Sequence, residues 1–449
     1  MPDSRVTGGL WMSEHPILQV AVVGSGPSGF YAAAALAGSQ TPCRIDIFER
    51  LPSPYGLIRA GVAPDHQTTK SIQDVFGETA RHPAVRFIGN VEIGRDISLA
   101  DLRGAYDAVV LASGVPEDAP LGIAGADLPG VHGAAAFVGW YNGHPDFSGL
   151  APDLAGRSAV ILGNGNVALD VARILSRTEE ELAASDIADH AAEALARSGL
   201  MHINVMGRRG PGEAKFTNVE LQEIGTLQGA TALADARQIP EDLPDGLPPR
   251  DRRMRAKNLD CFRRFAQSDP GAPGRRIRFG FFARPIAILG TGRVEAVRFA
   301  RAEQDPLFRS APDEFDIPAD IVIASIGYRA RPFSGLPLAE GERALANDDG
   351  RIEDGLYVVG WLKRGPSGKI ATNRLDGDAI AERIVAECSA SGAPGFSALA
   401  ERLADKGVRA SNFDHWLRMD AAEIAAARGP APRRKFTTIA DMLRAGGVA

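Results

Sequence analysis

Cysteine is scarce in this chain of 449 residues, and its placement excludes several kinds of site. The sequence contains three cysteines, Cys43, Cys261 and Cys388, and no C-x-x-C pair. A redox dithiol, a cysteine-ligated iron–sulfur cluster and a zinc ribbon each need closely spaced cysteines. The sequence therefore predicts none of these sites, and it predicts no bound metal.

The chain also lacks a long apolar run and a strong charge of either sign. No segment is long and apolar enough to cross a bilayer, and residues 1–16 lack the apolar core of a secretion signal. The net charge of −6 argues against a general affinity for nucleic acid. We therefore expect a cytoplasmic protein with no membrane span and no nucleic-acid partner. The length allows two or three domains.

What the sequence does contain is a pair of glycine-rich turns, each between an apolar strand and an apolar helix. The first turn follows the strand pattern of residues 18–23 and precedes the helix pattern of residues 30–36. In such a turn the first glycine allows the tight bend, the second lets the backbone approach a pyrophosphate, and the third lets helix and strand pack closely. The helix N-terminus adds free N–H groups and a partial positive charge. The residues of this turn are Gly24, Gly26, Pro27, Ser28 and Gly29.

An acidic residue at the next strand end supports a nucleotide at the first turn. The strand pattern of residues 44–49 ends at Glu49, about 25 residues after Gly24, and an acid near that spacing hydrogen-bonds a ribose diol. A lone glycine-rich turn is weak evidence, but here strand, turn, helix, strand and acid arrive in order. The sequence therefore favours a dinucleotide site over an ordinary loop.

The second turn has Gly163 and Gly165, with Ala168 as its third small residue, which still permits close packing, and it has a different strand end. It follows the strand pattern of residues 158–162, and the strand pattern of residues 202–206 is followed by Arg208 and Arg209 in place of an acid. An acid there would repel a 2′-phosphate, whereas arginine accommodates it, so the sequence favours NADP over NAD. An Ala- and acid-rich helical insertion at residues 178–198 explains the long spacing between this turn and the arginine pair.

Two such turns in one chain indicate a flavin held beside a nicotinamide, and therefore electron transfer. We predict an α/β fold with two Rossmann-like dinucleotide-binding domains, the NADP domain being inserted in the FAD domain. A strand pattern at residues 355–361 would return the chain to the first sheet. The predicted boundaries are 14–116 for the first part of the FAD domain, 117–330 for the NADP domain, and 331–449 for the second part of the FAD domain with a C-terminal extension.

Longer motifs in the right order make the sequence similar to a known family. The segments 54–66, 137–142, 163–173, 207–210 and 360–368 resemble the adrenodoxin-reductase-like ferredoxin–NADP reductases, including their mycobacterial members. The resemblance covers most of residues 18–385. It implies FAD in the outer domain and NADPH in the inserted one. It also implies that electrons pass from NADPH through FAD to a ferredoxin-type iron–sulfur protein.

The resemblance further implies which residues form the site. Those that would contact FAD are Glu49, Leu57, Val91, Trp361, Gly368, Lys369 and Ile370. Those that would meet NADP are Asn164, Gly165, Asn166 and Val167 at the pyrophosphate, Arg208 and Arg209 at the 2′-phosphate, and Glu220 and Gly368 nearby. His66 and Glu223 match the family's active-site histidine and acid.

Several of these residues also have an ordinary structural interpretation. An isolated histidine such as His66 is more often structural than functional, and only the family motif reverses this preference. Glu220 and Glu223 lie three apart on a predicted helix and share a face, which taken alone is an ordinary solvated acidic face. Residues 365 and 366 are predicted to open a helix toward the flavin, with Pro366 near its start.

A basic stretch at residues 250–264 has two interpretations that the sequence leaves open. It is either a solvated helix face or a docking surface toward which an acidic ferredoxin is steered. The candidate docking residues are Arg252, Arg253, Arg255 and Lys257.

Three other functions are compatible with two nucleotide turns. An electron-input subunit of an amidotransferase-type complex usually carries N-terminal cysteine clusters, which this chain lacks. An NADPH-dependent flavin monooxygenase needs a pocket for an organic substrate, which the sequence does not identify. A non-catalytic nucleotide sensor would not have its flavin reduced by NADPH. The ferredoxin reductase is the function that we predict.

Overall fold

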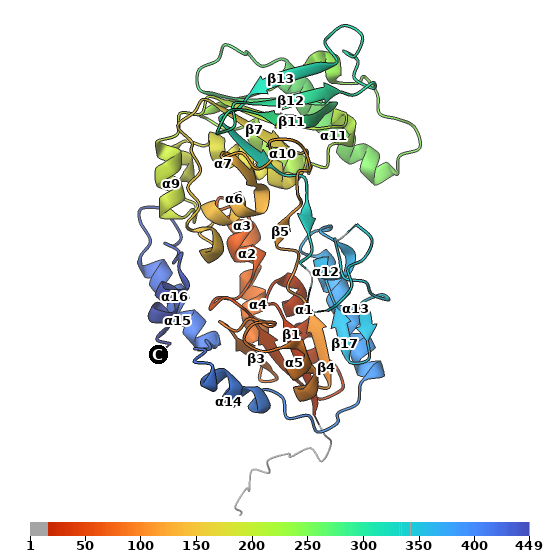
Figure 1. Cartoon of the computed structure of the whole chain (residues 1–449), viewed down its shortest axis with the longest axis vertical. Helices are drawn as coiled ribbons and strands as arrows, with labels where there is room; N and C mark the ends of the chain where they lie inside the picture. The colour runs from red at the N-terminus through yellow and green to blue at the C-terminus, as the bar shows by residue number, and fades with distance from the viewer. Residues whose placement is uncertain (1–16, 332, 334, 342, 449) are drawn as a thin grey trace, which may run out of the picture.

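The computed structural model describes residues 17–331, 333, 335–341 and 343–448, which form two lobes stacked along the long axis of the molecule (Figure 1). The expectation about a secretion signal, and the first residues of the predicted FAD domain, lie outside these residues. In the described part of the chain, no helix is long and apolar enough to cross a membrane.

The lower lobe of Figure 1 is built on a six-stranded sheet that two distant parts of the chain complete together. Its strand order is β16 (Arg351–Glu353), β17 (Leu356–Val358), β4 (Ala108–Leu111), β1 (Leu18–Val23), β2 (Cys43–Phe48) and β3 (Val85–Ile88). β17 runs parallel to β4, so the predicted return of the chain to this sheet is confirmed. β1 is apolar and almost entirely buried, as a central strand covered on both faces must be.

Helices from both parts of the chain cover this sheet. α1 (Pro27–Ala37) packs closely on α13 (Thr372–Glu387), because a Cβ atom at Gly377 would lie 2.7 Å from the backbone carbonyl carbon of Tyr31. The other helices of the N-terminal part are α2 (Leu57–Ala60), α3 (Gln67–Lys70), α4 (Gln73–Ala80) and α5 (Leu99–Ala105).

The upper lobe contains a second six-stranded sheet, in which every pairing is parallel. Its strand order is β6 (Val131–Gly133), β14 (Ile321–Ala324), β7 (Ser158–Leu162), β8 (His202–Met206), β10 (Arg275–Gly280) and β9 (Ala230–Ala234). The sheet of the lower lobe is parallel except for its edge strand β16, which is antiparallel to β17. Each lobe thus has the mostly parallel sheet of a dinucleotide-binding fold, and the predicted fold class is confirmed. The helices of this lobe are α6 (Ala134–Tyr141), α7 (Asn166–Ser176), α8 (Glu179–Leu182), α9 (Asp189–Ala196), α10 (Asn218–Ile224) and α11 (Pro249–Ala266).

A three-stranded antiparallel sheet completes the upper lobe, and the predicted insertion is helical. The added strands are β11 (Ala283–Leu289), β12 (Ala296–Arg301) and β13 (Glu314–Pro318). The insertion at residues 178–198 contains α8 and α9, and α8 begins at a capping box in which Thr178 and Glu181 satisfy each other's backbone N–H groups.

The two crossings between the lobes lie side by side. On the way up the chain forms β5 (Glu117–Asp118), and on the way down it forms β15 (Tyr328–Arg329), which pairs with β5 in antiparallel fashion. Asp118 accepts hydrogen bonds from the backbone N–H groups of Ala135 (2.7 Å) and Ala136 (3.2 Å). This carboxylate therefore fixes the crossing to the N-terminus of α6, where a helix favours negative charge.

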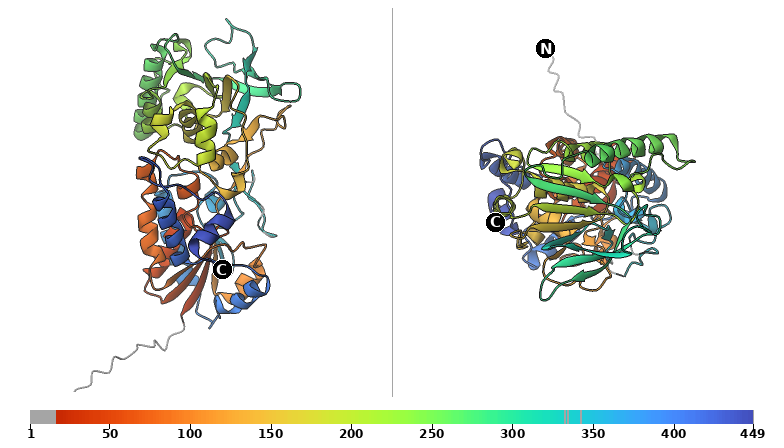
Figure 2. Two further views of the ribbon diagram at one scale, coloured as in Figure 1. Left: turned by 90° about the vertical axis from the view of Figure 1, so that its left-hand side faces the viewer. Right: turned by 90° about the horizontal axis from the view of Figure 1, so that it is seen from above.

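The weakly patterned C-terminal extension is folded onto the lower lobe. It forms α14 (Ser397–Asp405), α15 (Phe413–Ala425) and α16 (Ile439–Gly446), which run along the side of the molecule (Figures 1 and 2). Phe413, Trp416 and Met419 of α15 enter the same apolar cluster as Tyr55 and Phe76. Burying such a side chain contributes roughly 1.5–3 kcal/mol, so this extension is part of the lower lobe's core.

Candidate functional site

The first glycine-rich turn has the geometry that a pyrophosphate needs. Gly24 has a φ of +111°, and a Cβ atom there would lie 2.6 Å from the carbonyl oxygen of Ala112. A Cβ atom at Gly29 would lie 2.0 Å from the carbonyl oxygen of Gly24, so helix α1 packs directly on the turn. At Gly26, by contrast, a Cβ atom would meet nothing within 4 Å. That open space lies at the N-terminus of α1, where Pro27 is the first helical residue, and it suits a phosphate group.

Glu49 is held against this turn from the end of β2. Its Oε2 accepts hydrogen bonds from the backbone N–H (3.1 Å) and the hydroxyl (2.7 Å) of Ser25, and its Oε1 accepts one from the N–H of Leu51. The side chain is only half-buried. The carboxylate is therefore oriented beside the phosphate site, as the predicted contact with the ribose of FAD requires.

The remaining residues predicted for FAD gather around the same turn from separate elements. Leu57 is 49% exposed although it is apolar, and its neighbour Gly56 lies against Gly26, because a Cβ atom at Gly56 would be 3.1 Å from the Gly26 Cα. Val91 is buried, and its N–H donates to the carbonyl of Glu49. Leu57 is thus an exposed apolar side chain beside the turn, whereas Val91 is buried next to Glu49.

Gly360, the residue before Trp361, lies against the start of α1. Gly360 has a φ of +73°, and a Cβ atom there would lie 1.9 Å from the Ser28 Oγ, so only glycine lets the end of β17 approach α1 this closely. Trp361 stands 5.6 Å from Tyr328, measured between ring centroids. Gly368 and Lys369 are exposed and Ile370 is half-buried in the loop that follows.

The prediction that residues 365 and 366 open a helix is wrong. α12 (Trp361–Arg364) ends at Gly365, whose φ is +80°, and α13 does not begin until Thr372. The glycine ends the helix with a positive φ, which glycine adopts without the strain that a Cβ atom would cause. Lys363 and Arg364 both form ion pairs with Asp376 of α13.

The second turn contains polar atoms that have no partner in the described part of the chain. Gly163 has a φ of +140°, and a Cβ atom at Gly165 would meet nothing within 4 Å. Both amide atoms of Asn164 are buried without a hydrogen bond. Such groups cost about 1–3 kcal/mol when they stay unsatisfied, so a bound phosphate that accepts from the amide nitrogen stabilises this turn. The residues present therefore fit a nucleotide.

The arginine pair lies next to this turn and is available to a ligand. Gly207 is in contact with Asn164, since a Cβ atom at Gly207 would lie 1.7 Å from the Asn164 Nδ2. Arg208 and Arg209 follow and are exposed. Arg208 has no ion pair or hydrogen bond with any described residue, whereas Arg209 lies 4.0 Å from Glu213. Arg208 is thus the freer guanidinium for a 2′-phosphate.

Helix α10 faces the second turn with further unpaired polar atoms. Asn166 Oδ1 accepts a hydrogen bond from the N–H of Thr217 (2.8 Å), and Val167 is half-buried beside it. In the described part of the chain, Thr217 Oγ1 and Glu220 Oε2 are buried without a partner. The contact of Glu220 with NADP stays a prediction, and Thr217 is a further candidate that the sequence analysis did not name.

His66 and Glu223 meet across the boundary between the lobes. The His66 Nε2 lies 2.9 Å from the Glu223 Oε2, and their side chains are 20% and 35% exposed. His66 comes from the segment before α3 in the lower lobe, and Glu223 comes from α10 in the upper lobe. The pair is therefore partly open to a ligand, and it links the two predicted nucleotide sites.

A buried arginine supports this pair, and the sequence analysis did not anticipate it. Arg173 of α7 is fully buried, and it donates to both oxygens of Asp65 (2.7 and 2.9 Å) and lies 2.8 Å from Asp170. Burial opposes the charge on Asp65, but the ion pair with Arg173 outweighs it and lowers the pKa of that carboxyl. Arg173 is also 3.7 Å from Glu223. The only available signal was that Asp65 and Arg173 lie within the family motifs.

The basic stretch is the exposed face of α11, at the outer edge of the upper lobe (Figure 2). Arg252, Arg253 and Lys257 are exposed and Arg255 is half-buried. Arg252 lies 4.0 Å from Asp245 and donates to the carbonyl of Pro244. Arg253 and Lys257 are four residues apart and share one side of the helix, whereas Arg252 and Arg255 share another. The role of these residues in docking stays a prediction.

Comparison with known proteins supports this arrangement. A profile of the family described as "Pyridine nucleotide-disulphide oxidoreductase" matches residues 18–199. The chain is 40% identical to the NADPH-ferredoxin reductase FprA of Mycobacterium leprae, over 97% of this chain and 100% of that protein. It is also 40% identical to the mitochondrial NADPH:adrenodoxin oxidoreductase of Mus musculus, over 95% of this chain and 91% of that protein.

A solved structure shows that the similarity extends to the fold. The complex of Mycobacterium tuberculosis FprA with NADPH superposes with a TM-score of 0.87 at 38% identity, covering 96% of this chain and 99% of that one. The protein is accordingly a flavoprotein oxidoreductase that uses FAD and NADP(H). With two nucleotide turns, a histidine–glutamate pair between them and this near full-length identity, the chain belongs to the adrenodoxin-reductase-like family of NADPH-ferredoxin reductases.

Proposed function

We propose that this protein oxidises NADPH and delivers the electrons, through FAD, to a ferredoxin-type iron–sulfur protein. The observation that carries the proposal is the contact of His66 with Glu223, which joins the two nucleotide sites across the lobes at 2.9 Å. FAD, when bound, supplies the conversion between the two electrons of a nicotinamide and the single electrons of a cluster. The chain supplies the placement of the two rings.

The two turns bind and orient the nucleotides. Open backbone at Gly26 and Gly165 receives the two pyrophosphates, Glu49 holds the ribose of FAD, and Arg208 with Arg209 holds the 2′-phosphate of NADPH. We assign Trp361, which follows β17, to the flavin site, where its ring would exclude water. Because every one of these groups is fixed to a strand end or helix end, the rings are oriented before they react.

His66 and Glu223 control charge and protons at the junction. Hydride transfer needs no protein base, so we propose that His66 orients Glu223 and that the pair adjusts the charge beside the rings. Arg173 lies 3.7 Å from Glu223 and places a buried positive charge beside the pair.

Rapid mixing of the purified yellow protein with NADPH tests this function. We expect the flavin absorbance to bleach, more slowly with NADH than with NADPH, and the reduced protein then to reduce a ferredoxin from the same genome. A protein that NADPH leaves yellow would refute the proposal. A protein that is reduced by NADPH but passes electrons to none of a panel of ferredoxins would limit the function to NADPH oxidation.

The surface of this chain that we assign to ferredoxin docking is the exposed side of α11. We propose that an acidic ferredoxin binds at Arg252, Arg253, Arg255 and Lys257, since complementary charge raises the rate of encounter. We also keep the domain boundaries 14–116, 117–330 and 331–449. The pairing of β5 with β15 supports them, because both crossings between the lobes fall at those limits. A cytoplasmic location likewise remains our proposal.

A further inference from the structure

The C-terminal extension spans the two lobes as well as packing on the lower one. Between α15 and α16 lies a segment of residues 426–438, which we call the strap. It reaches the N-terminus of α9 in the upper lobe, where Arg428 and Arg434 pair with Asp189. Its base is held by Glu423 of α15, whose backbone carbonyl accepts from the N–H of Arg434 (2.8 Å) and whose Oε1 accepts from the N–H of Phe436 (2.8 Å). Glu423 itself is paired with Arg59 of α2.

One residue of the strap reaches a buried carboxylate of the upper lobe. The Lys435 Nζ lies 3.1 Å from the Asp186 Oδ2, and their side chains are 1% and 4% exposed. Lys70 of α3, in the lower lobe, donates to the other oxygen of Asp186 at 2.6 Å. Lys435 also donates to the side-chain oxygen of Asn142, which ends α6 of the upper lobe. Two lysines of one lobe thus hold a carboxylate of the other, away from water.

The same upper-lobe segment touches the loop that carries His66. The backbone N–H of Asp186 donates to the carbonyl of Pro64 at 3.1 Å, and Pro64 lies two residues before His66. Contacts therefore connect Lys435 through Asp186 to Pro64. From Pro64 the chain leads to His66, which contacts Glu223. An ion pair this deeply buried is strongly direction-dependent, because it must be well aligned to offset the loss of hydration.

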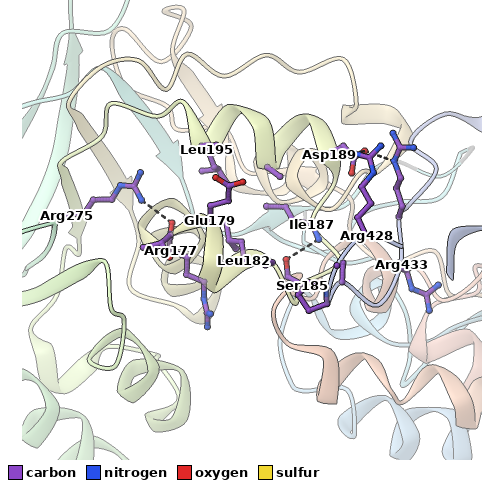
Figure 3. A pocket seen from close by; sticks show the side chains of 18 residues that line it. Arg177, Glu179, Leu182, Ser185, Ile187, Asp189, Leu195, Arg275, Arg428 and Arg433 are labelled. Carbon is purple, nitrogen blue, oxygen red and sulfur yellow. Dashed lines mark hydrogen bonds and ion pairs between the residues drawn. The ribbon is translucent and has the colours of Figure 1, made fainter. Parts of the chain in front are cut away.

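The boundary between the strap and the upper lobe is open to solvent farther from Lys435. A cavity of about 590 Å³ lies between the strap and the helices α8 and α9, and its walls include Ser185, Ile187 and Arg428 (Figure 3). Arg434 lies at this cavity and pairs with Asp189 at 2.5 Å, with the two side chains 47% and 37% exposed. The strap thus makes one buried ion pair, Lys435 with Asp186, and one exposed ion pair, Arg434 with Asp189. Substitutions at the two strap residues form a matched pair for a test.

We propose that Lys435 is a positioning residue for hydride transfer. It fixes Asp186, and with it the loop that carries His66, in a defined position relative to the other lobe. This inference rests on the proposed oxidation of NADPH by this protein. Lys435 touches neither nucleotide turn, so its removal changes the alignment of the two sites and leaves the nucleotide-binding groups in place. Asp186 keeps Lys70 as a partner when Lys435 is replaced, so no buried carboxylate is left without a cation.

The test compares Lys435→Met with the control Arg434→Met in the FAD-loaded full-length protein. We measure the FAD content, the Kd for NADPH, and the rate of flavin reduction in a single turnover with NADPH and with NADPH deuterated at the transferred position. For Lys435→Met we expect reduction slowed by about 10- to 100-fold, since a shift of about 1 Å costs on the order of 100-fold. We expect a retained isotope effect, full FAD content and an unchanged Kd. For Arg434→Met we expect a change below about twofold, because exposed ion pairs contribute little.

A second reaction separates positioning from general damage. Electron transfer from dithionite-reduced protein to ferricyanide does not use the NADP site, and we expect Lys435→Met to leave its rate unchanged. The inference is overturned if NADPH reduces the flavin of Lys435→Met at the wild-type rate, or if it reduces the flavin of Arg434→Met as slowly as that of Lys435→Met. It is also overturned if the rate of ferricyanide reduction by Lys435→Met falls by the same factor. If Lys435→Met loses FAD, the same comparison on Lys435→Gln decides by the same criteria. Wild-type protein that NADPH does not reduce would instead refute the proposed function.

Discussion

The arginine pair after β8 gives the sharpest prediction about cofactor choice. Arg208 has no partner in the described part of the chain and Arg209 is 4.0 Å from Glu213, so both are available to a 2′-phosphate. Hydrogen bonds to charged groups contribute roughly 1.5–3 kcal/mol each, and exposure favours the lower end of that range. The double substitution R208A/R209A should therefore lose about 3 kcal/mol toward NADPH, or on the order of 100-fold in kcat/KM.

The assay compares NADPH with NADH, using ferricyanide as the acceptor. NADH lacks the 2′-phosphate, so its kcat/KM should change little in the double variant, and the preference for NADPH should nearly vanish. Arg208→Ala alone should cost more than Arg209→Ala, because Glu213 already competes for Arg209. Arg253→Ala, an exposed arginine on α11, serves as the control for a general loss of positive charge. Equal losses with NADH and NADPH would refute the assignment of this pair.

Three further predictions follow from contacts elsewhere. Glu49→Ala should weaken FAD retention, because the ribose loses its acceptor, and a variant that stays fully yellow through gel filtration and dialysis would contradict this. Ferredoxin-dependent turnover should fall more steeply with salt than ferricyanide reduction, and Arg253→Ala should flatten that slope; parallel salt curves would exclude the α11 face. Because Arg173 lowers the pKa of Asp65, their pair should stabilise the fold above about pH 4 and lose this effect as the pH falls through the lowered pKa. Urea unfolding of Arg173→Met should show a loss of about 3–5 kcal/mol at pH 7 that shrinks in acid; a loss independent of pH would contradict this reasoning.

The two turns illustrate what could be predicted from sequence. Gly24 and Gly163 adopt positive φ angles, and Gly26 and Gly165 leave open space, which are requirements on single backbone positions. Glu49 follows at a fixed distance because it ends the next strand of the same βαβ unit. Requirements of this kind are local, so they leave a spacing in the sequence that can be recognised without a structure.

The helix start predicted at residues 365 and 366 shows where local reasoning failed. A glycine followed by a proline fits a helix start as well as a helix end. Tertiary packing decided the outcome, because Arg364 is paired with Asp376 of α13 and Gly365 ends α12 with a positive φ. The C-terminal extension gave a similarly weak pattern, although α15 supplies Trp416 and Met419 to the core.

The sequence by itself determined the two nucleotide turns, the acid after the first and the arginines after the second, and hence the kind of cofactors that the chain holds. Only the tertiary structure decided what lies between them: the contact of His66 with Glu223, the arginine that supports it, and the ion pair of Lys435 with Asp186. The physical reason is that a turn requires particular residues at neighbouring positions of the sequence. An ion pair between lobes requires only that two charged groups meet in space, so it leaves no fixed spacing in the sequence.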